Sequence, residues 1–390
     1  MKQGWEYKKL GEVCTIERGG SPRPITDYIT DSEDGINWIK IGDAQEGSKY
    51  ITSTKEKIRP EGIKKSRFVH KGDFILSNSM SFGRPYILKV DGCIHDGWLV
   101  IHDDNEVFIK DYLYYILSSS IMYAKFSQLA VGGVVNNLNS SLVRKVAIPI
   151  PPKSTQLSIV SELDKINELI RLKKEQLKDY DNLAQSIFYE MFGDPVENEK
   201  GWEVKKLGEV CTIERGSSPR PITAYITDSK DGINWIKIGD AQEGSKYITS
   251  TKEKIKPEGL KKSRFVHKGD FILSNSMSFG KPYILKIDGC IHDGWLVIHD
   301  NNNVFIKIYL YYLLASSIMY AKFSKLAVGG VVNNLNSSLV RKVDGSIPPL
   351  PLQHLFAQRI EQIEHQKSEV AKAITDLETL LASRMQHWFE

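Results

Sequence analysis

The sequence predicts a mixed α/β (α+β) protein. Two copies of one globular domain are joined by two long helices that form an antiparallel coiled coil with approximate twofold symmetry. The main observation is an internal repeat at an offset of 197 residues, with 14 substitutions in the 142 pairs that compare residues 5–146 with residues 202–343. Beyond Pro152 and its copy Pro349 the identity falls away, while the spacing of apolar residues stays in step. A period of this length indicates duplication of whole domains rather than a solenoid.

The repeat divides the 390 residues into alternating globular and helical segments, and each globular segment is long enough to bury its own core. The expected boundaries are 1–152 and 195–349 for the globular domains, and 153–194 and 350–390 for the helices. Short apolar runs and alternating patterns predict strands in the first copy. These strands cover residues 36–41, 72–76, 86–90 and 97–101. Apolar and aromatic residues at helical spacing predict one amphipathic helix over 107–126.

The long helices are predicted from apolar residues that recur at alternating steps of three and four. The seam positions are Leu163, Ile166, Ile170, Leu177, Tyr180 and Ile187 in the first helix, and Ile360, Ile363, Val370, Ile374, Leu377 and Leu381 in the second. A seam held over about five heptads is typical of a coiled coil. Pro151-Pro152 with Ser154 opens the first helix and Gly193-Asp194-Pro195 closes it. The alternative to pairing is that each helix packs only on its own globular domain.

Charge separates the two kinds of segment. Residues 1–150 hold 20 Lys and Arg against 18 Asp and Glu, and residues 198–347 hold 22 against 15, whereas both helical segments carry a net negative charge. This placement favours globular domains that face phosphate on a scaffold that faces protein. No apolar run approaches the roughly 20 residues of a membrane span, and the first residues do not begin a signal peptide. We therefore expect a cytoplasmic protein. Its four cysteines, without Cys-x-x-Cys spacing, are expected to be reduced core thiols rather than metal ligands.

Three polar loops and a basic cluster in each globular domain have a composition suited to DNA. Guanidinium and amide groups pair with base edges, lysines suit phosphate, and glycines allow close backbone approach. The candidate DNA-binding residues of the first copy are Arg18, Ser21, Arg23, Lys64, Lys65, Ser77, Asn78, Ser79, Arg84, Gly132, Gly133, Asn136 and Asn137. Those of the second copy are Arg215, Ser218, Arg220, Lys261, Lys262, Ser274, Asn275, Ser276, Lys281, Gly329, Gly330, Asn333 and Asn334. The alternative for any one loop is an ordinary turn, but their coexistence in a duplicated domain favours binding.

Motifs for catalysis are missing from the sequence. His95-Asp96 and His102-Asp103 suggest acid–base chemistry, but neither pair has a nucleophile or second carboxylate at informative spacing, so ordinary surface or core histidines are expected. There is no Gly-x-x-x-x-Gly-Lys-Ser/Thr phosphate loop and no Gly-x-Gly-x-x-Gly opening a helix. The Asn/Asp-Pro-Pro-aromatic tetrapeptide of amino-methyltransferases is absent too. We therefore expect no catalytic residue, metal or cofactor in this chain.

Several segments, in this order and duplicated, resemble the specificity subunit (HsdS) of type I restriction–modification systems over essentially the whole chain. They are Trp5–Val13, Trp38–Asp43, Gly72–Ser77, Ser81–Arg84, and Leu138-Asn139 leading into Ile148–Pro152 with Gln156, together with their copies. The resemblance implies two target recognition domains that bind a bipartite double-stranded DNA target, and helices that dock two methylation subunits. Those partners would carry S-adenosylmethionine and adenine N6-methyltransferase chemistry. Two restriction subunits would add ATP- and Mg²⁺-dependent translocation and cleavage.

One departure from the family pattern is that the two recognition domains are nearly identical, which predicts an interrupted palindrome as the target. Two competing interpretations remain open. The chain would otherwise be a tandem adaptor for nucleic acid, including single strands, or for glycans. The third interpretation, a DNA-modifying enzyme in its own right, is disfavoured by the missing cofactor and metal motifs.

Overall fold

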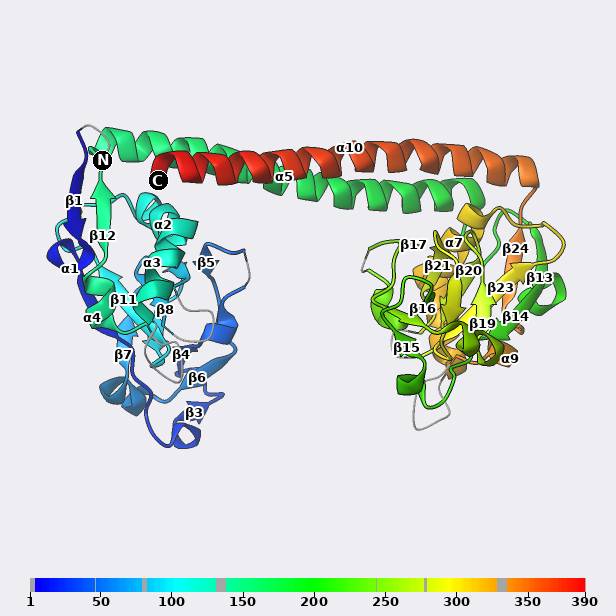
Figure 1. The fold of residues 1–390 in the computed structure, drawn as a ribbon, viewed down its shortest axis with the longest axis horizontal. Coiled ribbons are helices and arrows are strands. Elements are labelled where there is room, and N and C mark those ends of the chain that lie inside the picture. Colours follow the sequence, from blue (N-terminus) through cyan, green and yellow to red (C-terminus); the bar gives the residue numbers. More distant parts are fainter. Residues whose placement is uncertain are drawn as a thin grey trace. The chain divides into compact units, whose positions relative to one another are not determined.

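The structure is a computed structural model, and it describes residues 4–45, 47–78, 83–130, 138–242, 244–276, 279–327 and 335–389. The chain forms two compact units (Figure 1). The first comprises Met1–Lys174 with Lys372–Glu390, and the second comprises Glu175–Ala371. Each unit therefore contains one globular domain and one end of each long helix. No helix in the described ranges is long and apolar enough to cross a membrane.

The globular domain of the first unit is built on two five-stranded sheets and a two-stranded ribbon. One sheet has the order β2 (Thr15–Arg18), β11 (Trp98–His102), β8 (Phe74–Ser77), β9 (Pro85–Leu88) and β5 (Tyr50–Ile51). The other has the order β3 (Ile29–Thr30), β6 (Glu56–Ile58), β4 (Ile36–Ile39), β10 (Gly92–Ile94) and β7 (Arg67–Val69). The ribbon pairs β1 (Glu6–Lys9) with β12 (Ala147–Ile150) in antiparallel register. The four strands expected from the sequence are thus confirmed as β4, β8, β9 and β11.

The second unit repeats this topology. Its first sheet has the order β14 (Cys211–Arg215), β23 (Trp295–Asp300), β20 (Phe271–Ser274), β21 (Pro282–Leu285) and β17 (Tyr247–Ile248). Its second has the order β15 (Ile226–Thr227), β18 (Glu253–Ile255), β16 (Ile233–Ile236), β22 (Gly289–Ile291) and β19 (Arg264–Val266), and its ribbon pairs β13 (Glu203–Lys206) with β24 (Asp344–Ile347). Short helices in the two units are α1 (Leu10–Val13), α4 (Ser140–Arg144), α6 (Leu207–Val210) and α9 (Ser337–Val340). Single-turn 3₁₀ helices are η1 (Ile25–Asp27), η2 (Ile41–Asp43), η4 (Ile222–Ala224) and η5 (Ile238–Asp240), with longer ones at η3 (Pro60–Lys65) and η6 (Pro257–Lys262).

The single helix expected over 107–126 is two helices in the structure, α2 (Lys110–Ser118) and α3 (Ser120–Ala130). Between them the buried Ser119 is extended, and its hydroxyl donates to the Ile116 carbonyl (2.7 Å) and accepts the Met122 N–H (3.3 Å). One side chain thus caps both helices, which explains a break that apolar periodicity does not reveal. The second unit repeats it in α7 (Lys307–Ala315) and α8 (Ser317–Ala327).

The core of each domain has two layers because successive residues of a strand face opposite sides of the sheet. Along β8, Phe74 and Leu76 pack with the helices, whereas Ile75 packs between the sheets. All four cysteines are buried, as the sequence predicts. Burial raises the pKa of the Cys14 thiol to about 12, so this thiol is protonated at neutral pH.

The long helices are α5 (Lys153–Phe192) and α10 (Leu350–Phe389), each of 40 residues. In the first unit Glu162 pairs with Arg384, and Lys174 Nζ lies 2.9 Å from Glu378 Oε1. In the second unit Lys367 Nζ lies 2.5 Å from Asp181 Oδ1. Partner numbers fall along α10 as they rise along α5, so the predicted antiparallel pairing is confirmed. All twelve predicted seam residues are buried or half-buried.

Each unit also packs both long helices against its globular domain. Pairing of the helices and packing on a globular domain therefore occur together. In the first unit, Ile159 and Leu163 of α5 and Trp388 of α10 join the core beneath α2. In the second unit the end of α5 supplies Phe188 and Phe192. Helix α5 ends where the sequence predicts, at Gly193, whose φ of +74° is accessible mainly to glycine.

Candidate nucleic-acid interface

Two of the predicted DNA-binding loops converge on the turn His95-Asp96-Gly97, which joins β10 to β11. They are residues 18–23, the arginine loop, and the segment that begins with Ser77 and Asn78, the Asn78 loop. Ser21 Oγ donates to Asp96 Oδ1 (2.8 Å), and Arg23 Nη2 donates to Asp96 Oδ2 (3.4 Å). The backbone carbonyl of Asp96 accepts from Arg18 Nε and from Asn78 Nδ2, both at 2.9 Å. Four candidate residues from two separate loops therefore share one aspartate. The second copy repeats these four bonds around Asp293, from Arg215, Ser218, Arg220 and Asn275.

The geometry of this turn depends on a glycine. The Gly97 N–H donates to His95 Nδ1 (2.7 Å), and a Cβ at Gly97 would lie 2.1 Å from His95 Cε1. Only a residue without a Cβ allows the imidazole to lie over it. Since Nδ1 accepts a hydrogen bond, a neutral ring carries its proton on Nε2. Burial lowers the pKa of His95 and so favours that neutral form.

The buried candidates Ser77 and Asn78 hold the loops together from inside. The Ser77 hydroxyl accepts the Arg84 N–H (3.0 Å), and Asn78 as a whole residue is only 1 % exposed. The Leu138 N–H donates to the Asn78 carbonyl (2.9 Å), which ties the end of the third predicted loop to the same turn. Ser274 and Asn275 are buried in the same way, while Ser276 is half-buried. The candidates Ser79, Gly132, Gly133, Asn136, Asn137, Gly329, Gly330, Asn333 and Asn334 lie outside the described residues.

The predicted basic cluster is exposed on η3. Lys64 and Lys65 are exposed, and Lys65 Nζ donates to the Tyr28 hydroxyl (2.7 Å) while lying 5.1 Å from the centre of that ring. Arg67 begins β7, two residues after Lys65, and its Nε donates to the Arg18 carbonyl (2.9 Å). This hydrogen bond connects the basic cluster to the arginine loop. Lys261 and Lys262 occupy the same places on η6.

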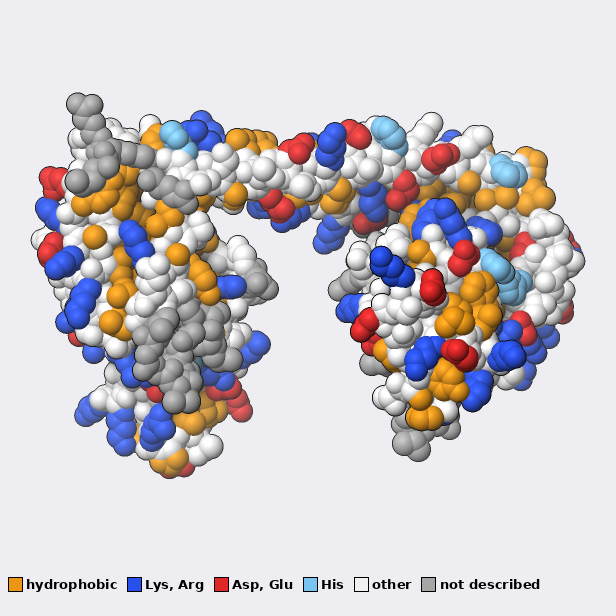
Figure 2. Space-filling model, in the orientation of Figure 1, with side chains coloured by type: hydrophobic (Ala, Val, Ile, Leu, Met, Phe, Trp, Pro, Cys, Tyr) orange, Lys and Arg blue, Asp and Glu red, His pale blue; other side chains and the backbone are white. Residues whose placement is uncertain are grey.

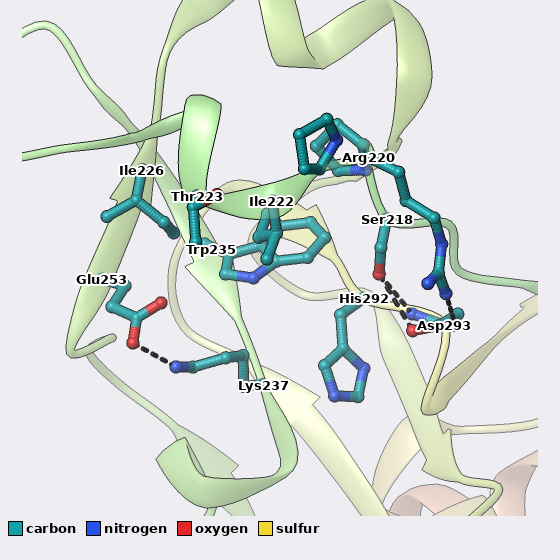
Figure 3. A pocket seen from close by; sticks show the side chains of 12 residues that line it. Ser218, Arg220, Ile222, Thr223, Ile226, Trp235, Lys237, Glu253, His292 and Asp293 are labelled. Atoms are coloured by element: carbon teal, nitrogen blue, oxygen red, sulfur yellow. Dashed lines mark hydrogen bonds and ion pairs between the residues drawn. The ribbon is translucent and has the colours of Figure 1, made fainter.

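A cavity of about 790 Å³ opens beside the aspartate of the second copy. Trp235 and His292 line it, with their rings edge-to-face at 6.2 Å, and so do Arg220 and Asp293 (Figure 3). The lining is completed by Ser218, Pro219, Pro221, Ile222, Thr223, Ile226 and the ion pair of Lys237 with Glu253. All twelve lining residues have identical counterparts in the first copy. A mostly apolar cavity with a few convergent polar groups is typical of a ligand site.

Arg84 and its counterpart Lys281 do not line the cavity beside the aspartate. Each lines a second cavity in its own unit. The exposed Arg84 lines a cavity of about 480 Å³ with Tyr86, Tyr114 and Tyr123. The second unit has a cavity of about 460 Å³ with Lys281 at the matching position. This pair is one of the few places where the two candidate interfaces differ chemically.

The aspartates remain ionised at neutral pH. The hydrogen bond from the Ser21 hydroxyl, with smaller contributions from His95 and Arg18, lowers the pKa of Asp96 against the opposing effect of burial. Burial opposes ionisation of Asp293 more strongly, but the hydrogen bond from the Ser218 hydroxyl, with smaller contributions from His292 and Arg215, still leaves its pKa lowered. Two guanidinium groups surround one carboxylate in each copy, so the cluster carries a net positive charge. On the face shown in Figure 2, further Lys and Arg side chains are spread over both globular domains.

Sequence reasoning considered His95-Asp96 only as a possible acid–base pair and missed its role as the acceptor for the arginine loop. Trp235, Lys237 and Glu253, which line the cavity of the second copy, were also missed. A usable signal was present, because a His-Asp-Gly triplet directly before the buried strand 98–102 indicates a tight turn.

The chain belongs to the family described as the type I restriction modification DNA specificity domain, whose model matches residues 2–179 and again residues 199–378. It is similar to the putative type I restriction enzyme MjaX specificity subunit of Methanocaldococcus jannaschii, with 24% identity over 98% of this chain and 93% of that protein. It is also similar to the MjaIX specificity subunit of the same organism, with 27% identity over 63% of this chain and only 60% of that protein.

A solved structure from work on complex assembly and conformational transition of the type I R-M system has the same fold. Its TM-score is 0.67 and its identity 20%, with 99% of this chain and 97% of that chain covered. The duplicated α/β domains and paired helices are therefore the architecture of a type I restriction–modification specificity subunit, the family to which the sequence resemblance pointed.

Proposed function

We propose that each globular domain binds one half of a bipartite duplex DNA target, and that the interface is the loop cluster around Asp96 and Asp293. The observation that carries this is the convergence of the arginine loop and the Asn78 loop on one turn, identically in both copies. Guanidinium groups from a positively charged cluster suit both phosphate and base edges. Because the side chains of the two clusters match and the helices run antiparallel, the proposed target is an interrupted palindrome.

We further propose that the paired helices dock two methylation subunits. Several leucines of α5 point away from the seam and are exposed, namely Leu157, Leu169, Leu172 and Leu183. Exposed leucines also occur on α10, at Leu355 and Leu380. Exposed apolar positions on acidic helices fit a protein partner better than nucleic acid. In this proposal the chain selects the sequence and performs no catalysis. The methylation partners supply S-adenosylmethionine, and restriction subunits, if they join, use ATP and Mg²⁺.

Methylation sequencing of a host that expresses this chain with a type I methylation subunit tests the proposal. We expect methylated adenine in one short word on each strand, with the two words inverted and separated by a fixed spacer. The purified chain alone should transfer no methyl groups and should prefer a defined duplex over either single strand. Methyl transfer by the single chain would favour the enzyme interpretation, and equal binding of single strands would favour the adaptor.

A further inference from the structure

The guanidinium of Arg23 contacts the Asp96 carboxylate through one nitrogen and is otherwise exposed to solvent. Its Nη2 lies 3.4 Å from Asp96 Oδ2, and in the second copy Arg220 Nη2 lies 3.3 Å from Asp293 Oδ2. The side chain of Arg23 is nevertheless 81 % exposed. Arginine has five N–H donors in a planar fork, so one contact with the carboxylate leaves most donors available to a ligand. Its orientation is restricted while its binding capacity is retained.

The carboxylate that orients Arg23 is itself fixed. Ser21 Oγ donates to Asp96 Oδ1 (2.8 Å), and the Asp96 N–H lies 3.3 Å from the same hydroxyl. The Asp96 backbone is further held by Arg18 and Asn78. A guanidinium aligned by a rigid acid loses less side-chain entropy on binding than a free one. This arrangement favours a ligand with directed acceptors over a phosphate, which needs only nearby positive charge.

The next donor in the same cavity is a histidine. In the second copy His292 and Arg220 both line the cavity beside Asp293 (Figure 3). The Gly294 N–H donates to His292 Nδ1 (2.7 Å), so the neutral imidazole presents Nε2–H. Lys237 adds a third donor, and Glu253 is neutralised by its ion pair with Lys237. The polar groups that remain available at this cavity are therefore mainly donors.

Guanine has the base edge in the major groove that best matches a set of donors, because thymine presents a single acceptor, O4, beside its methyl group. Guanine presents two acceptors, N7 and O6, which the arginine fork contacts in bidentate fashion, whereas adenine and cytosine present a donor amine. We propose that Arg23 and Arg220 each contact a guanine edge in the two half-sites, and that Asp96 and Asp293 position them. This rests on the proposed function, because it assumes that the loop clusters bind duplex DNA.

Selection from randomised duplexes by the full chain is the first test. We expect wild type to enrich a half-site word that contains guanine. The paired substitution Arg23→Lys with Arg220→Lys should reduce discrimination at that one guanine by about 5- to 150-fold, because an ammonium does not reproduce the fork. Lys64→Ala with Lys261→Ala is the matched control. It should weaken binding to all sequences and leave the selected word unchanged.

Asp96→Asn with Asp293→Asn separates positioning from folding. Removing a negative charge should leave non-specific affinity equal or higher, while discrimination at the guanine falls. Damage to the fold would lower both affinities. Replacing the guanine by 7-deazaguanine removes only the N7 acceptor. It should weaken binding of wild type about 10-fold or more and have little further effect on the Arg→Lys variant.

The outcomes distinguish the inference from the proposed function. If wild type selects no duplex word, the proposed function itself fails. If wild type selects a word but the Arg→Lys variant keeps every preference, or 7-deazaguanine affects both proteins equally, guanine contact by these arginines is excluded. A loss of affinity that is uniform across all sequences in the Arg→Lys variant would mean that the arginines contact phosphate. Should the Asn variant not fold, the Arg→Lys and 7-deazaguanine results still decide the contact.

Discussion

Phe389 packs against Tyr112 in the first unit, with 5.9 Å between their ring centroids, although the two residues belong to different copies of the repeat. The second unit has the reciprocal contact, in which Phe192 lies 4.7 Å from Tyr309. Each globular core is therefore completed by the end of the helix that follows the other globular domain. A sequence repeat and a structural unit therefore do not coincide, because the end of each long helix belongs to the unit of the other copy.

This exchange predicts which unit a core mutation damages. Phe192→Ala should destabilise the second unit by about 3–5 kcal/mol, because Phe192 is buried among Phe188, Tyr309 and Phe356. Hydrogen exchange should show lost protection in β20 and β23 before any loss in β8 and β11. Phe389→Ala should give the reverse order with a smaller effect, since Phe389 is only partly buried. The exchange would be contradicted if Phe192→Ala first lost protection in β8 and β11, or if Phe389→Ala first lost it in β20 and β23.

A second prediction concerns a buried lysine that is paired differently in the two units. The side chain of Lys246 is 7 % exposed, and its Nζ lies 2.9 Å from Glu364 Oε1. Its counterpart Lys49 has two acids, Asp111 at 2.5 Å and Asp164 at 3.6 Å. Glu364→Gln should therefore cost about 3–5 kcal/mol, because it leaves a buried ammonium without its charge partner. Asp164→Asn should cost much less, and urea unfolding of the two variants compares them directly.

The same lysine should make the stability of the protein depend on pH. Burial lowers the pKa of Lys246 below its usual 10.5, although Glu364 opposes the shift. Between the lowered pKa of folded Lys246 and the usual 10.5, the unfolded chain binds more protons at this lysine than the folded chain. The free energy of unfolding therefore rises with pH across this range. Glu364→Gln removes the opposing effect and should lower the pKa further. The stability difference between wild type and variant should therefore shrink from pH 7 to pH 10. A constant difference would mean that Lys246 does not titrate as expected.

A third prediction concerns the positioning aspartates at low pH. The pKa of each carboxyl is lowered, so its stabilising effect is present above the ordinary value of 3.8 and is lost as pH falls through the folded pKa. Wild type should lose stability between pH 4 and pH 2 more steeply than the variant Asp96→Asn with Asp293→Asn. Thermal unfolding across this range measures the slopes, and parallel slopes would show that the carboxylates do not stabilise the loops.

Sequence patterns predicted the features that are local or strictly periodic. The repeat, the seam from Leu163 to Ile187 and the buried strands follow from residue spacing, because alternation and heptads are properties of neighbouring residues. The role of Asp96 was not predictable in that way, since its partners Ser21 and Asn78 are 75 and 18 positions away. Only the order of strands in the sheets brings them together. The pairing of Lys246 with Glu364 was missed for the same reason, as it joins a strand end to a helix more than a hundred residues later.

The last prediction tests the turn itself with two glycines. Gly97→Ala, made together with Gly294→Ala, places a Cβ 2.1 Å from the histidine Cε1, so the imidazole must leave its position. We expect a loss of about 1–3 kcal/mol in stability and a larger proportional loss of specific than of non-specific DNA binding. Gly42→Ala with Gly239→Ala is the matched control, because nothing lies within 4 Å of the added Cβ at either position. The control should change stability by no more than about 0.5 kcal/mol. Equal effects on DNA binding in both double variants would show that the histidine turn does not organise the interface.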